Sequence, residues 1–167
     1  MPLTANIAVT IEAVHTAASD LSAPVDTLRR SKRRSWLSGV ANGQIDEKFA
    51  DTRTLAASAN EDIDLIGALA NVFGATVNFA EIAAIYIEAD AANTNNVRVG
   101  PAASNGFLGP FADITDRIIV APGQMFLITA PDAGWSVTAG TGDKLNIANS
   151  GGGTAVTYSI VVFGRTA

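Results

Sequence analysis

Hydrophobic and polar residues alternate with a period of two along most of this chain. The pattern is clearest near the C-terminus, where strands are predicted over residues 135–139, 144–148 and 154–163. Glycine-rich segments at 140–142 and 149–153 separate these runs. A period of two gives each strand one dry face and one wet face, and glycine turns between such runs are typical of antiparallel hairpins. This part of the chain is therefore predicted to be scaffold, and it holds no residue suited to chemistry.

The same pattern recurs in shorter pieces from residue 46 onward. Strands are predicted near residues 48–55, 62–69, 78–79, 82–89, 97–99, 117–120 and 125–129, with turn residues between them. A short helix within 64–73 is an alternative, although Gly67 and Gly74 argue against much length. Many short strands without a long helical period indicate an all-β fold. We predict an antiparallel β-sandwich, jelly-roll-like, over residues 46–167.

Residues 1–45 have a different character. Ile7, Val9 and Ile11 alternate with small or polar residues, which favours a strand, and residues 19–26 form a polar link that contains a proline. The apolar residues of this region are too scattered to build a core of their own. We therefore expect an extended N-terminal arm that packs on the body, on a neighbouring subunit or on a host surface.

Composition limits the classes of protein that fit. The length of 167 residues allows one well-buried core, and the absence of cysteine excludes disulfides and thiolate zinc sites. No signal peptide is expected at the N-terminus, and no apolar run is long enough to span a membrane. Residues 1–34 hold five Lys/Arg against three Asp/Glu, a net charge of +2, whereas the remainder holds six against thirteen, a net charge of −7. This asymmetry suggests a basic attachment segment and an acidic, solvated body.

The basic run is the strongest local signal in the chain. Five cations lie within six residues, namely Arg29, Arg30, Lys32, Arg33 and Arg34. Such a run repels itself and seldom folds inward without acidic partners. The run is compatible with binding to nucleic acid, with binding to an acidic protein surface, and with a solvent-exposed segment that has no partner. Only Trp36 supplies a nearby aromatic residue and the body is acidic, so we favour contact with an acidic protein surface and expect no nucleic-acid partner.

Candidate catalytic and metal-binding groups are few. His15 is the single histidine, and no nucleophile elbow accompanies it. The acidic cluster at residues 61–64 lacks the spacing of a calcium loop, and Asp62 and Asp64 share one face of a predicted strand. The glycine-rich segments precede strands and not helices, so they are predicted to be hairpin turns and not phosphate-binding loops. We expect no catalytic residue, no metal and no cofactor, and hence no enzyme.

Several phrases of the sequence resemble small structural proteins of tailed bacteriophages. They are FADTRTLAA (49–57), EDIDL (61–65), FGATVNF (73–79), IYIEAD (85–90), NNVRVG (95–100), VAPGQMF (120–126), VTAGTGD (137–143) and VVFG (161–164). The chain looks like a phage virion protein of the head-decoration or cement type over about residues 46–164. These segments correspond to strands and turns and contain no catalytic motif, so they indicate the fold and the kind of particle more than a biochemical activity.

The resemblance implies a homo-oligomeric jelly roll, a dimer or trimer, seated on the outer surface of the capsid where capsomers meet. Its expected partners are the major capsid protein and further copies of itself, with no membrane involved. The hypothesis drawn from it is a non-enzymatic decoration protein that stabilises the head lattice. A receptor- or glycan-binding head of a fibre or spike is the alternative, and a small hydrolase is disfavoured because His15 stands alone. The residues expected to contact a partner are Ile7, Val9, Ile11, Arg29, Arg30, Lys32, Arg33, Arg34, Trp36 and Leu37.

Overall fold

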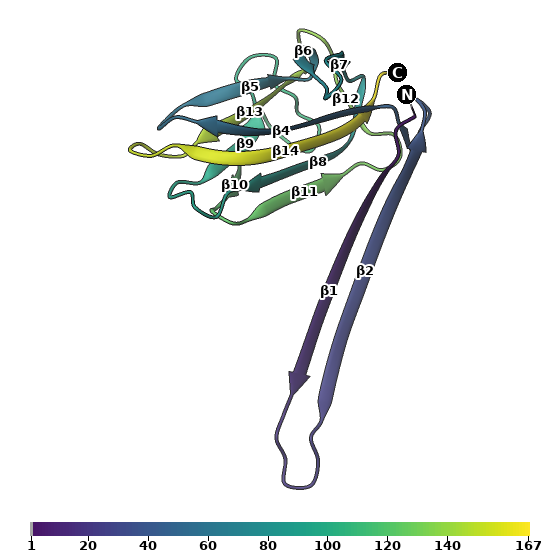
Figure 1. Cartoon of the computed structure of the whole chain (residues 1–167), viewed down its shortest axis with the longest axis vertical. Coiled ribbons are helices and arrows are strands. Elements are labelled where there is room, and N and C mark those ends of the chain that lie inside the picture. Colours follow the sequence, from purple (N-terminus) through teal and green to yellow (C-terminus); the bar gives the residue numbers. More distant parts are fainter. Residues whose placement is uncertain (1) are drawn as a thin grey trace.

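A long two-stranded arm stands out from a two-layered β-structure in the computed structural model, which describes residues 2–167 (Figure 1). No helix occurs among these residues, so none of them forms a membrane-crossing helix. The predicted fold class, an all-β sandwich with an extended N-terminal arm, is confirmed. The hydrophobic alternation explains it, because each strand has one face that must be covered by a second layer.

Two antiparallel sheets make up the sandwich. Sheet I has the strand order β11 (Met125–Thr129), β8 (Glu81–Ala89), β14 (Val156–Arg165), β4 (Glu47–Leu55), and the short β12 (Trp135–Ser136) also pairs with β8. Sheet II has the order β10 (Ile118–Val120), β9 (Val97–Pro101), β13 (Lys144–Asn149), β5 (Asn60–Asp64). The chain crosses between the sheets repeatedly, and this strand order is that of a jelly roll.

The main core lies between the two sheets. Along β14, Val156, Tyr158, Ile160 and Val162 are buried, and the residues between them are only half-buried. β13 alternates in the same way, with Leu145 and Ile147 directed inward. The period of two in the sequence therefore corresponds directly to the inner and outer faces of each sheet.

The segment that allowed a short helix forms strands instead. β6 (Ile66–Ala70) and β7 (Thr76–Asn78) pair as a small antiparallel hairpin. Gly67 has a φ of +88°, which a helix does not accommodate. The side-chain oxygen of Asn71 accepts bonds from the backbone N–H groups of Phe73 and Ala75 and so holds the turn. The helix alternative is wrong because local turn chemistry outweighs the apolar spacing.

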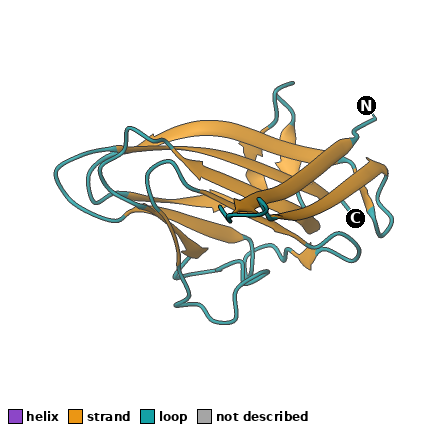
Figure 2. Cartoon of the chain, turned by 90° about the horizontal axis from the view of Figure 1, so that it is seen from below, coloured by secondary structure: helices purple, strands orange, loops and turns teal. Residues whose placement is uncertain are grey.

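The arm is a regular hairpin, as seen also from below in Figure 2. β1 (Ala5–Thr16) and β2 (Val25–Ser38) pair antiparallel over their lengths, and β3 (Gln44–Ile45) pairs with the end of β2. The strand expected around Ile7–Ile11 is present, and the polar link at 19–26 supplies the hairpin turn and the start of β2. The basic run is itself a strand, which the sequence pattern does not indicate.

Tyr158 provides a test of the core at alkaline pH. Its buried hydroxyl donates to Glu61 Oε1 at 2.6 Å, and burial followed by this bond raises the pKa of Tyr158 well above its ordinary value. The folded chain holds the proton more tightly than the unfolded chain, whose tyrosine pKa is about 10. This group should therefore leave stability unchanged below pH ~10 and lower it as pH rises further.

Tyr158→Phe should remove part of that alkaline slope and cost about 1.5–3 kcal/mol at neutral pH through the lost bond to a carboxylate. Denaturant unfolding of both proteins across the alkaline range measures this. If the unfolding free energy depended on alkaline pH equally in both proteins, Tyr158 would not be the group responsible.

Candidate functional site: the N-terminal arm and the groove at its base

The two faces of the arm follow from its register. Ile7, Val9 and Ile11 lie opposite Arg34, Lys32 and Arg30, and opposed residues of an antiparallel pair share a face. We call this the inner face, since its base residue Trp36 packs on the body. The outer face carries Ala8, Thr10, Glu12 and Val14 opposite Arg33, Ser31, Arg29 and Thr27. The basic run is thus divided between both faces of one ribbon.

The projecting part of the arm has no cover within the described chain. Every residue from 8 to 35 is exposed. The exposed apolar side chains include Ile11 at 58%, Val14 at 65% and Leu21, at the tip, at 99%. On the outer face, Arg29 Nε bonds Glu12 Oε1 at 2.9 Å and Thr10 shares a hydroxyl contact with Ser31. Such exposed pairs contribute little stability.

The base of the arm is anchored by a second hydrophobic cluster, separate from the main core. Trp36 is 1% exposed and packs with Ile45, Ala83 and Ala84. Its ring centroid lies 6.5 Å from that of Phe163 on β14, at an interplanar angle of 36°. Leu3, Ala5 and Ile7 close the cluster from β1 and the chain before it. The arm is therefore rooted on β8 and β14 of sheet I.

A buried arginine fixes the loop that follows the arm. Arg165, at the end of β14, is almost fully buried and pairs with Glu81. Its guanidinium also donates to Asn42 Oδ1 at 3.1 Å and to the backbone carbonyls of Asp132 and Ala133. Because Asn42 lies in the loop between β2 and β3, this network holds the arm's return to the body.

The structure distributes the predicted contact residues unequally. Val9, Ile11 and all five cations lie on the projecting ribbon, and Leu37 is also exposed. Ile7 is half-buried against the body. Trp36 lies in the chain's own cluster and not on a free surface, because the inner face turns toward sheet I at the base. Within residues 36–45, Trp36 and Ile45 are buried against the body, so the part that projects with every residue exposed is 8–35.

A groove opens between the base of the arm and the outer surface of sheet I. It has a volume of about 550 Å³. One wall is β1 from Asn6 to Thr10, and the other is Tyr86, Met125, Leu127, Val161 and Phe163. The second wall is mainly apolar, which is unusual for the outward face of a sheet that would otherwise meet water. Sequence reasoning missed this groove, although the alternating apolar residues of 125–129 and 161–163 carry its signal.

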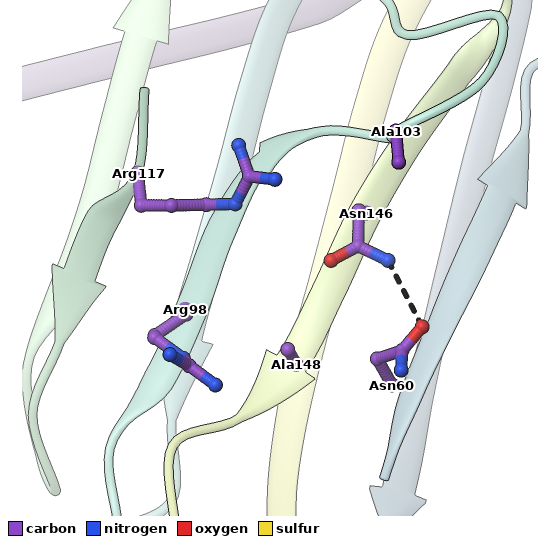
Figure 3. Close-up of a pocket in the computed structure, with 6 residues that line it drawn as sticks. All are labelled: Asn60, Arg98, Ala103, Arg117, Asn146 and Ala148. Atoms are coloured by element: carbon purple, nitrogen blue, oxygen red, sulfur yellow. Dashed lines mark hydrogen bonds between the residues drawn. The ribbon is translucent and has the colours of Figure 1, made fainter. Parts of the chain in front are cut away.

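A second, polar depression lies on the outer surface of sheet II (Figure 3). It has a volume of about 320 Å³ and is lined by Asn60, Arg98, Ala103, Arg117, Asn146 and Ala148. Asn146 Nδ2 donates to Asn60 Oδ1 at 3.2 Å and to Asp62 Oδ1 at 2.7 Å. Arg117 Nη1 donates to the carbonyls of Ile114 and Asp116. Within residues 2–167 neither Arg98 nor Arg117 pairs with a carboxylate, so both retain donors for a ligand.

The remaining chemical candidates serve local structure. Asp64 Oδ1 accepts the backbone N–H of Ile66, and Asp62 holds Asn146. Asp113 caps its own turn, since its carboxylate accepts both the backbone N–H and the hydroxyl of Thr115, and these bonds lower its pKa. His15 lies on the exposed arm opposite Asp26. No cluster of three metal-ligating side chains forms within the described residues.

Comparisons with known proteins add little. No protein-family model matches the chain, and no curated protein matches it. Among solved structures, it is similar to one from work on Bacillus endospore appendages, described as a family of disulfide-linked pili. That similarity has 18% identity, a TM-score of 0.35, and covers 78% of this chain and 98% of the other. A TM-score this low carries no argument about this chain, which has no cysteine.

Substitution of Trp36 tests the anchor of the arm. Trp36→Ala should cost about 3–5 kcal/mol, since it leaves a cavity between β8, β14 and the arm. The indole Nε1–H is buried without a hydrogen-bond partner. Trp36→Phe removes that unpaired donor and keeps an aromatic ring, so it should cost about 1 kcal/mol or less. Equal losses in the two variants, measured by denaturant unfolding, would contradict this account of the anchor.

Proposed function

We propose that this chain is a non-enzymatic structural protein that decorates a particle surface, of the phage capsid cement type, and that it attaches through its arm. One observation carries the proposal: residues 8–35 form a regular hairpin that stands clear of the body with every residue exposed. The body supplies a stable jelly roll whose described acidic residues mostly serve turns and ion pairs. The arm supplies the surface that a partner would cover.

The physical state of the arm supports attachment as its role. An isolated two-stranded hairpin is at best marginally stable in water, because it lacks a covered hydrophobic face. Here the arm's apolar residues Val9, Ile11 and Leu28 share one exposed face. Covering them on assembly would contribute about 25 cal/mol per Å² of apolar surface removed from water. The arm therefore gains most of its stability from a partner.

Charge supports a protein partner. The projecting ribbon carries all five cations of the N-terminal region, and the rest of the chain is strongly acidic. A basic ribbon and an acidic body favour binding to an acidic protein surface while keeping the outer side of the particle solvated.

Such a protein would stabilise a shell by linkage. A ligand that binds the assembled lattice and not the dissociated subunits adds its binding free energy to assembly. Copies joined to one another would bind several lattice points at once, and each further contact would benefit from a raised effective concentration. Weak contacts per arm would then suffice for a tight clamp.

Shortening the arm tests the proposal. A variant that lacks residues 9–32 and joins Ala8 to Arg33 through Asn-Gly keeps the Trp36 anchor and provides a two-residue hairpin turn. It should fold, as judged by thermal unfolding and circular dichroism, but lose binding to purified heads that lack the protein by at least about a hundredfold. A control that only replaces residues 17–24 with Asn-Gly keeps both arm faces and should still bind. Normal binding by the folded short-arm variant would overturn the proposal.

A receptor- or glycan-binding role is the second candidate, and the depression on sheet II favours it. Arg98 and Arg117 offer donors for a carboxylate, and Asn60 and Asn146 add amide groups beside them (Figure 3). These groups suit an acidic saccharide, which combines a carboxylate with hydroxyl groups. The aromatic platforms that sugars commonly stack on are missing from the residues that line this depression.

The two candidates separate by experiment. If the depression binds acidic saccharides, glycan-array binding by the intact protein should fall at least about tenfold in the double variant Arg98→Ala, Arg117→Ala. The matched variant Arg30→Ala, Lys32→Ala removes two cations from the arm and should leave glycan binding unchanged. Absence of array binding by the unaltered protein would remove this second candidate.

A further inference from the structure

We propose that the groove beside sheet I receives the arm of a second copy of this chain, and that two copies exchange arms reciprocally. This inference rests on the proposed function, in which the arm is an attachment element, and it names one partner of the arm's inner face.

The outer surface of sheet I changes in character along its strands. Its pairing places Leu127, Tyr86, Val161 and Ala50 in one row across β11, β8, β14 and β4. The neighbouring row nearer the arm's base contains Thr129, Ala84, Phe163 and Lys48, and the next row away contains Met125, Glu88, Ser159 and Thr52. Beyond it, Asp90 lines a small polar depression together with Glu88. An apolar band therefore borders an acidic and hydroxyl-rich one.

This surface is open to a partner. Met125 is 65% exposed, and no strand or loop of residues 2–167 covers the groove that it lines. Glu88 accepts a 2.5 Å hydrogen bond from the Tyr86 hydroxyl, which holds the ring across the sheet and keeps the carboxylate at the border of the two bands. Covering this exposed apolar wall with apolar side chains would be favourable, because it removes apolar surface from water.

The inner face of the arm complements both bands. β1 contributes the apolar line Val9, Ile11 and Ala13, and β2 contributes the cations Arg30, Lys32 and Arg34 beside it. The apolar and cationic lines of the arm are therefore complementary to sheet I, where an apolar band lies next to the carboxylates of Glu88 and Asp90. The outer face lacks such a pattern, because its Arg29 is already paired with Glu12.

A chain's own arm does not fill its own groove. Ile7 closes one end, where it is half-buried with Phe163, but the ribbon then leaves the body. Ile11 and Leu28 on the inner face remain exposed, and the groove keeps its volume of about 550 Å³. The inner face beyond Val9 is therefore available to another molecule.

Reciprocal exchange closes the assembly. If each arm lies in the other copy's groove, the same patches meet on both sides, which gives a two-fold dimer with no unsatisfied arm. Both inner faces are then covered, while both outer faces and the tips at residues 17–24 remain free for the lattice. The dimer would present two outer faces, each carrying Arg29 and Arg33, to one particle, which is the multivalent arrangement that the proposed function needs.

Photo-crosslinking on the full chain tests the exchange, and the absence of native cysteine makes labelling specific. Ile11→Cys carrying a benzophenone group is mixed with heavy-isotope-labelled unaltered protein, and adducts are mapped by mass spectrometry. We expect adducts in heavy peptides on outward positions of β8, β11 and β14, among them Tyr86, Met125 and Leu127. The inference would be overturned if adducts in the heavy-labelled protein occurred only in its arm, or if no heavy-labelled peptide carried an adduct. The same label at Val14→Cys, on the outer face, should give few or none on sheet I.

Matched charge substitutions provide an independent readout. Ile11→Asp should weaken dimerisation at least about tenfold by sedimentation analysis, whereas Val14→Asp, equally exposed on the other face, should not. A chain that stays monomeric at all concentrations would overturn the inference. Binding of both proteins to heads lacking the decoration is measured in parallel. If the chain is monomeric but still binds heads, and if shortening the arm abolishes this binding, the exchange is wrong and the proposed function is retained.

Discussion

The position of the arm depends on the packing of one side chain, Trp36. It is the single large aromatic residue of β2, and it packs with Ala83, Ala84 and Ile45. Phe163 supports its ring from β14, and the buried Arg165 secures the loop that follows. Ile7 also packs on this cluster, and every residue of the ribbon from 8 to 35 is exposed. Without this anchor the arm would be a tethered hairpin; with it, the arm leaves the body in a defined direction.

The anchor also relates the arm to sheet I. Because Trp36 and Ile7 share the inner face, the register of β1 and β2 determines that Val9 and Ile11 lie on the same face of the ribbon as the anchor. A slip by one residue would move every apolar inner side chain to the outer face. The pairing of Ala5 with Trp36 therefore connects the local packing at the base to the chemistry of a surface many residues away. The proposed attachment through the arm and the proposed exchange through the groove both depend on this one register.

Much of the body could be predicted from the sequence because several of its strands, β13 and β14 most clearly, alternate between buried and half-buried residues. β4, β8, β11 and β13 lie within a residue or two of the predicted ranges, and the jelly-roll order agrees with the expected class. β2 was not predicted as a strand, because five cations in six residues carry no period of two. That strand forms since β1 pairs with it. The burial of Trp36 depends on residues 45, 83 and 84, whose proximity no local pattern reveals. Likewise, Arg98 lies on β9 and Arg117 lies in the loop just before β10, and the two line one depression only in the folded chain.

Hydrogen exchange along the arm tests the central claim, that the exposed hairpin becomes ordered on assembly. Backbone amides open with a free energy set by their local stability. In dilute, unassembled protein, the paired amides of residues 8–35 should exchange far faster than those of β8 and β14. In the assembled state the same amides should become protected by at least about a hundredfold, with little change in the body. Arm amides already protected in dilute protein to the level of the sandwich core, or unchanged on assembly, would contradict the account.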